Sequence, residues 1–158
     1  MSAKKLGEAK ITSLSAEGFF EPFAADDVPW QRVGNSDPFK RLGRYGGGSH
    51  VGVGLDVLKP GHFSNRFHYH LAEEEHIFIL KGSATLHLGE RRYVMKARDY
   101  CCFPAGQAAG HHLFNHTSEN CVFLTIGENK PDDVAVFPPN AAGKAKAKTR
   151  TKKPEVKT

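Results

Sequence analysis

Short runs of apolar residues, separated by turn-forming residues, cover most of the chain. Within each run apolar side chains alternate with small or polar ones, and Gly, Pro or Asn interrupt the pattern roughly every 8–12 residues. No stretch shows a convincing helical periodicity. Because alternation with period two is typical of strands with one buried face, the pattern predicts an all-β barrel or sandwich. The expected strands cover residues 51–58, the segment around His68 and His70, and residues 76–81, 84–88, 92–97, 99–103, 111–115, 120–127 and 134–137.

The two ends of the chain differ from this pattern. Residues 1–48 have weak periodicity and carry aromatic side chains spaced by acids and prolines, which indicates an irregular arm that packs on a scaffold. From residue 141 onward Lys alternates with Ala and Thr, and such a segment has no apolar side to bury. We therefore expect an N-terminal arm over 1–48, a β-barrel over 49–140 and a disordered Lys-rich tail over 141–158.

The net charge of +5 belongs to the tail, because residues 141–158 contain seven Lys or Arg residues and one Glu. The globular part is then close to neutral. The tail could contact nucleic acid or anionic lipid through non-specific charge. There is no helix-turn-helix pattern and no phosphate-binding loop, since GGGSH at 46–50 precedes a strand. We expect no specific nucleic-acid partner.

Composition also indicates the cellular compartment of the protein. No apolar run is long enough to span a bilayer, and the N-terminus lacks the apolar region of a secretory signal. The three cysteines, Cys101, Cys102 and Cys121, form neither a disulfide framework nor zinc-ribbon spacing. We interpret them as packing residues of a cytoplasmic protein, with one candidate reactive thiol among them.

Candidate chemistry concentrates in residues 61–82. His68 and His70 are two residues apart, so in a strand both imidazoles face one side. Glu75 follows the polar break LAEE, and a hairpin there would bring it beside them. Two imidazoles and one carboxylate are a set used by non-haem iron enzymes. His111, after a Pro-Ala-Gly turn, is the candidate fourth ligand; the alternative is simply a polar strand face.

These segments resemble the two motifs of the cupin family. Gly61, His68, His70, Glu75 and Gly82 take the places of the first motif, and Asp99, Pro104, Gly106, His111 and Asn115 those of the second. Arg98 occupies a position where a glycine is usual. The spacings between Gly61 and His68 and between Gly106 and His111 are longer than usual. FPAG followed by GHHLFN is similar to a group of bacterial single-domain cupins with largely unassigned function, some labelled sugar-phosphate-isomerase-like. The resemblance covers about residues 42–138.

The resemblance implies a cupin jelly roll, a double-stranded β-helix of the RmlC-like type. It also implies one divalent transition metal, Fe, Mn, Ni, Co or Zn, bound by His68, His70, Glu75 and His111. Glu73 and Glu74 are rival carboxylates. An inward Arg66 could bind a substrate carboxylate or phosphate.

Two functions stay open. One is a small metalloenzyme, of the isomerase, decarboxylase or dioxygenase type, that acts on a small sugar or carboxylic acid. The other is a cupin that binds or senses a small ligand without turnover. Outward apolar residues such as Phe78 and Leu80 suggest a homodimer.

Overall fold

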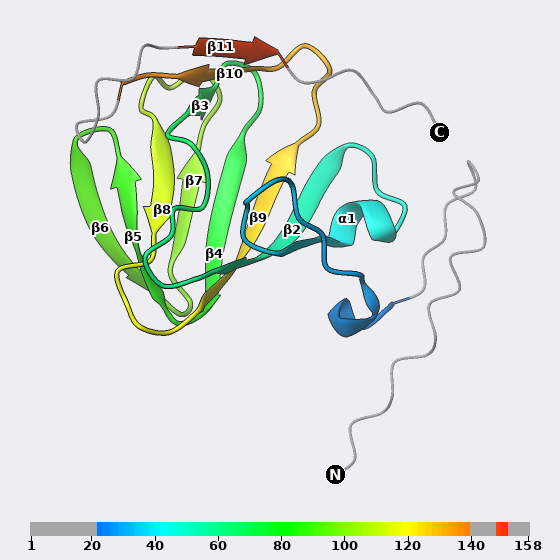
Figure 1. The fold of residues 1–158 in the computed structure, drawn as a ribbon. Coiled ribbons are helices and arrows are strands. Elements are labelled where there is room, and N and C mark those ends of the chain that lie inside the picture. The colour runs from blue at the N-terminus through cyan, green and yellow to red at the C-terminus, as the bar shows by residue number, and fades with distance from the viewer. Residues whose placement is uncertain (1–21, 140–147, 152–158) are drawn as a thin grey trace.

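The computed structural model describes residues 22–139 and 148–151. Two antiparallel sheets face one another and enclose the interior of a barrel, and a third sheet lies across one end (Figure 1). The predicted all-β barrel is therefore confirmed. The larger sheet has the strand order β1-β2-β9-β4-β7. Its strands are β1 (Phe39–Arg41), β2 (Val51–Leu58), β9 (Cys121–Glu128), β4 (Glu75–Lys81) and β7 (Tyr100–Phe103).

The facing sheet has the order β6-β5-β8, and the sheet across the end has the order β11-β10-β3. Residues 63–68 continue the facing sheet beyond β8 through isolated bridges, one of which joins His68 to His111. The strands are β6 (Arg91–Lys96), β5 (Ser83–Leu88), β8 (His111–Phe114), β10 (Val134–Phe137), β3 (Tyr69–His70) and β11 (Lys148–Thr151).

The core lies between the two facing sheets. Ile77, Ile79 and Phe123 project from the larger sheet, and Leu86 and Leu113 project from the smaller one; all five are buried. Full burial of one such side chain contributes about 1.5–3 kcal/mol. The period-two pattern in the sequence thus corresponds to the inner faces of the two sheets.

Two turns require left-handed backbone conformations. Gly82, between β4 and β5, has φ +80°, and a Cβ there would lie 2.7 Å from the carbonyl oxygen of Asn120. Arg98, between β6 and β7, has φ 79° and is the only non-glycine residue with positive φ in the described part of the chain. This is the position where the sequence departs from the motif's usual glycine, the residue that adopts a positive φ most readily.

The described part of the N-terminal segment attaches to the larger sheet. It contains a 3-10 helix, η1 (Ala25–Asp27), a short helix, α1 (Leu42–Tyr45), and β1, which pairs with β2. Lys40 is 2% exposed and donates to the carbonyl of Ala25.

At the other end, β11 pairs with β10, and the remainder of the predicted tail lies outside the described residues. None of the described helices has the length and apolar character needed to cross a membrane.

The expected hairpin between the histidine segment and β4 is wrong. β3 pairs with β10, not with β4. The reason is Asp133, whose carboxylate accepts hydrogen bonds from the amides of Ala72 and Glu73 and contacts the His70 ring. These contacts hold residues 71–74 beside the loop that precedes β10, so β4 pairs with β7 and β9.

Candidate metal centre

Hydrogen bonds to the far side of each ring set the tautomers of His68 and His70. Nδ1 of His68 lies 2.7 Å from the carbonyl oxygen of Arg66, and Nδ1 of His70 lies 2.6 Å from Oδ2 of Asp133. A carbonyl or an ionised carboxylate can only accept, so both Nδ1 atoms carry the proton. Burial lowers the pKa of His68 below its ordinary value, which favours the neutral ring. With the proton on Nδ1, the neutral form of each ring presents the lone pair of Nε2.

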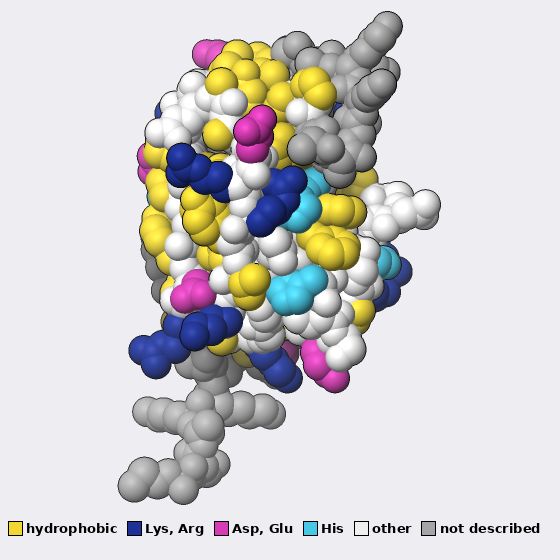
Figure 2. All heavy atoms as spheres, turned by 90° about the vertical axis from the view of Figure 1, so that its left-hand side faces the viewer, with side chains coloured by type: hydrophobic (Ala, Val, Ile, Leu, Met, Phe, Trp, Pro, Cys, Tyr) yellow, Lys and Arg dark blue, Asp and Glu magenta, His cyan; other side chains and the backbone are white. Residues whose placement is uncertain are grey.

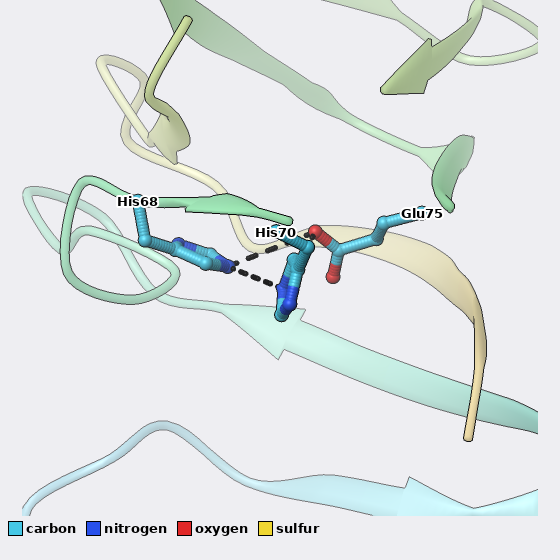
Figure 3. Close-up of side chains that lie close together, drawn as sticks. All are labelled: His68, His70 and Glu75. Atoms are coloured by element: carbon cyan, nitrogen blue, oxygen red, sulfur yellow. Dashed lines mark hydrogen bonds and ion pairs between the residues drawn. The ribbon is translucent and has the colours of Figure 1, made fainter. Parts of the chain in front are cut away.

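The two lone pairs point at one another and at a carboxylate (Figure 3). The Nε2 atoms of His68 and His70 are 3.1 Å apart, and Oε2 of Glu75 lies 3.8 and 3.9 Å from them. Three acceptor atoms that converge in this way repel each other unless a cation lies between them. The donor set therefore fits a divalent transition metal.

His111 completes the group from the opposite sheet. Its Nε2 lies 2.7 Å from Oε2 of Glu75, and its ring stacks on Phe103 with centroids 3.6 Å apart. Its Nδ1 is buried and has no hydrogen-bond partner among the described residues. In the arrangement seen, His111 donates to Glu75; as a fourth ligand it would give up this proton.

The charge state of Glu75 follows from its neighbours. Burial acts to raise its pKa, but the hydrogen bond from His111 and the three nearby imidazoles outweigh burial, and the pKa lies below its ordinary value. The side chain is thus a carboxylate that can coordinate at neutral pH. It reaches the interior because β4 alternates Glu75, Ile77 and Ile79 inward.

The structure brings together all four side chains that sequence reasoning proposed as ligands: His68, His70, Glu75 and His111. Metal binding by them stays a prediction. The rival carboxylates do not join the Nε2 atoms of His68 and His70: Glu73 lies on the far side of the His70 ring, 3.9 Å from its Nδ1. Glu73, in the connection before β4, accepts from the Lys130 amide at 2.6 Å, and Glu74 points outward to His76 at 3.1 Å.

Arg66 does not point into the barrel cavity. It is exposed, and its guanidinium lies 4.3 Å from the centroid of the Phe137 ring, which in turn packs on His68. Its carbonyl orients His68. A substrate contact by its side chain stays a prediction.

Sequence reasoning missed Asp133. Its side chain is buried, and the hydrogen bonds from His70 and from the Ala72 and Glu73 amides hold its pKa below the ordinary value although burial acts to raise it. It is 63 residues from His70 in sequence. A carboxylate on the imidazole of a ligand is a recurrent support for metal sites, since it orients the ring and raises its basicity.

Sequence reasoning also missed Asp56, the only charged residue of β2. Its carboxylate accepts from the Thr125 hydroxyl at 2.8 Å. Burial, and to a smaller degree the charge of Glu75, raise its pKa to about 6, although the Thr125 hydrogen bond acts to lower it. A lone acid within the alternating run VGVGLDVL was the signal that could have identified it.

Two hollows meet at the candidate ligands. The first, inside the barrel, has a volume of about 50 Å³ and is lined by Asp56, Glu75 and His111 together with apolar core residues and a few further polar ones. The second, of about 40 Å³, lies at the mouth and is lined by His70, His111 and Gln107 among others. His111 borders both, so the ligand group stands between the mouth and the interior.

The outer face of the β6-β5-β8 sheet carries a second group of histidines. His112, the neighbour of His111, points outward as expected, and its Nε2 lies 3.0 Å from Nδ1 of His87. Burial, followed by His87, lowers the pKa of His112 to about 4. On the face nearest β6 and β5, hydrophobic, basic and histidine side chains are interspersed (Figure 2).

Asn115 stabilises the turn that follows β8. Its side chain is fully buried and makes hydrogen bonds to the carbonyls of Leu58 and Glu119 and from Thr117.

A small antiparallel β-barrel with inward histidines and a carboxylate near its mouth defines a class of protein, the jelly-roll barrels with a candidate metal site. Residues 54–127 match the family model described as Cupin domain. Residues 54–127 are thus a cupin domain, and the described chain has the cupin fold. No curated protein is significantly similar to it in sequence.

Solved structures support this assignment. A sugar phosphate isomerase of the cupin superfamily from Silicibacter pomeroyi is 26% identical, with TM-score 0.70 over 87% of this chain and 96% of that one. A protein from Acidithiobacillus ferrooxidans, provisionally assigned as a sugar phosphate isomerase, is 27% identical, with TM-score 0.63 over 77% and 81%. The polyketide cyclase RemF from Streptomyces resistomycificus shares the fold alone, at 19% identity and TM-score 0.62 over 73% and 84%.

Proposed function

We propose that this cupin is a metal-dependent enzyme that acts on a small polar molecule, a sugar phosphate or a carboxylic acid. The observation that carries the proposal is the convergence of two Nε2 atoms and the Glu75 carboxylate beside a small cavity inside the barrel. The similarity to a sugar phosphate isomerase over nearly the whole chain supports the substrate class.

The residues of the site would have two roles, metal binding and proton transfer. His68, His70, Glu75 and His111 would hold the ion, which when bound supplies a Lewis acid for substrate oxygens. Asp56 lines the same cavity, and a carboxyl group with a pKa of about 6 can take and return a proton near neutral pH. We assign it the acid–base role.

The cavity restricts what can react. Its volume of about 50 Å³ is well below that of a drug-sized ligand pocket. Apolar side chains of Phe103, Phe123 and Leu86 and the polar groups of Asp56, Glu75 and Thr125 line it together. Only a small reacting group can therefore lie beside Asp56, which favours proton movement within a small substrate, as in isomerisation or decarboxylation.

The proposal is tested by metal analysis and turnover. Protein from minimal medium is expected to contain about one equivalent of a transition metal, and His70→Ala and Glu75→Gln to lose it. A panel of sugar phosphates, keto acids and dicarboxylates is then assayed with wild type and with Asp56→Asn, which should keep metal and lose turnover. Oxygen consumption in the same assays distinguishes Fe(II)-dependent oxygenation. Retention of metal by both ligand variants would disprove the metal assignment.

The alternative is a cupin that binds a small molecule without turnover. The cavity supports binding as well as it supports catalysis. A compound from the panel that raises the melting temperature of wild type and of Asp56→Asn equally, and is recovered unchanged, would favour this alternative.

A further inference from the structure

Three side chains with metal-binding groups meet on the outer face of the larger sheet, outside the barrel. His76 and Cys102 are directly paired across β4 and β7, and Glu74 precedes His76 by two residues. One ligand atom from each lies within 4.8 Å of the other two. All three residues are half-buried, so the group is neither fully solvated nor closed.

The imidazole of His76 is held in place from both sides. Its Nε2 lies 3.1 Å from Oε1 of Glu74, its Nδ1 lies 2.7 Å from the Tyr100 hydroxyl, and the two rings are nearly parallel at 23°. A tyrosine hydroxyl can both donate and accept. In the arrangement seen, Nε2 of His76 donates to Glu74 and Nδ1 accepts from Tyr100. With a cation bound, the proton can lie on Nδ1 and be donated to the Tyr100 oxygen, which frees the lone pair of Nε2 for the metal. A partner of this kind on the far nitrogen is typical of metal-ligating histidines.

We propose that Glu74, His76 and Cys102 form a second metal site, for a divalent transition metal of the zinc type. Thiolate, imidazole and carboxylate together select zinc or cobalt over magnesium and calcium. Ligand atoms around tetrahedral zinc lie about 3.3–3.8 Å apart, and small side-chain rotations reach this spacing from the arrangement seen. The three groups leave the fourth position open to solvent or to a further ligand.

A free reactive thiol explains the group less well. The sulfur lies beside the Glu74 carboxylate, which would repel a thiolate, and the thiol form is a poor nucleophile. A bound cation would replace the thiol proton and relieve the contact with Glu74. Because β7 is an edge strand, the metal would also tie that edge to β4.

The sulfur atom makes the site distinguishable from the candidate centre inside the barrel, whose donors are nitrogen and oxygen only. The full chain, treated with chelator and then titrated with Co²⁺, is expected to bind two equivalents and to show the near-ultraviolet sulfur-to-cobalt charge-transfer absorption. Addition of Zn²⁺ should remove that absorption.

Three variants complete the test. Cys102→Ser should lose the absorption and bind one equivalent, and His76→Ala should weaken cobalt binding at this site at least tenfold. Cys101→Ser is the matched control, because Cys101 packs against the core on the opposite face, and it should behave as wild type. The equivalent retained by Cys102→Ser shows that the variant is folded, and circular dichroism checks this independently.

The outcomes separate this proposal from the one for the barrel interior. Absence of the absorption in wild type, or its persistence in Cys102→Ser, would overturn the outer site. Glu75→Gln should keep the absorption and bind one equivalent. If Glu75→Gln still bound two equivalents while Cys102→Ser bound one, the outer site would stand and the inner assignment would fall.

Discussion

Strand β4 and the residue before it contribute to two candidate metal groups, one on each face of the larger sheet. The two groups differ in burial, in donor atoms and in the segments that supply them. Glu75 points inward to buried histidines, whereas Glu74 and His76, its neighbours, point outward to Cys102. The inner group has nitrogen and oxygen donors from three separate segments. The outer group comes from two adjacent strands and includes sulfur.

The difference teaches that burial and supporting hydrogen bonds, more than residue types, decide what a cluster can do. Inside the barrel the imidazoles are oriented by a carbonyl and a buried carboxylate, next to a cavity that admits a small reacting group. On the outer face water competes for every donor, and a single hydroxyl supports the histidine. The inner group is therefore suited to chemistry and the outer group to holding an ion.

The largest expected effect comes from matched changes of the two glutamates. Glu75→Gln removes the carboxylate at the centre of the inner group, so tightly bound metal in protein from minimal medium should fall from about one equivalent to below about one tenth. Glu74→Gln should leave that tightly bound metal in place. Elemental analysis after dialysis measures both. Equal losses in the two variants would contradict the assignment of separate sites.

Asp133 tests the support of the inner group. Asp133→Asn keeps the size of the side chain but weakens its hold on His70, and metal affinity should fall about 10- to 100-fold. Tyr100→Phe makes the corresponding change at His76 and should affect only the cobalt absorption of the outer site. Competition with a chelator of known affinity gives both values. An unchanged affinity in Asp133→Asn would mean that His70 is not a ligand.

The pH dependence of stability tests whether Asp56 is an inward, buried acid. Its pKa is raised from 3.8 to about 6 in the folded chain, so the folded state binds more protons between these values. The free energy of unfolding contributed by Asp56 therefore falls as pH rises from about 4 to about 6. Relative to wild type, metal-free Asp56→Asn should gain on the order of 2–3 kcal/mol between pH 4 and pH 8.

Chemical denaturation at the two pH values measures that gain. His112 shifts the opposite way, because its pKa is lowered to about 4 and the stability it contributes is lost as pH falls from about 6.5 to about 4. Wild type alone would mix the two effects, so the difference between variant and wild type is the quantity to compare. A constant difference would show that folding does not change the pKa of Asp56.

The smallest effect is at the turn between β6 and β7, away from both metal groups. Arg98 has a left-handed backbone conformation, which costs a non-glycine residue about 1–2 kcal/mol. Arg98→Gly should stabilise the chain by about 1 kcal/mol after the entropy loss of glycine is subtracted, with both metal stoichiometries unchanged. Thermal denaturation measures it; destabilisation would show that the Arg98 side chain contributes more than the strain costs.

Sequence reasoning identified local features and failed on contacts between distant segments. Strands such as β2 and β9 follow from alternation of apolar residues, which is a local property. Asp133 was missed because its partner His70 is 63 residues away. The same contact explains the incorrect hairpin, since Asp133 binds the amides of residues 72 and 73 that a hairpin turn would have used.

The sequence by itself determined the all-β class, the inward direction of Glu75, and a set of four residues that the fold brings to one place. Those properties depend on side-chain period and on spacing within short segments. Only the tertiary structure decided which nitrogen of each histidine faces the carboxylate, which acid lines the cavity, and that His76 lies opposite Cys102. These properties depend on hydrogen bonds and burial between segments far apart in the chain, which no local pattern records.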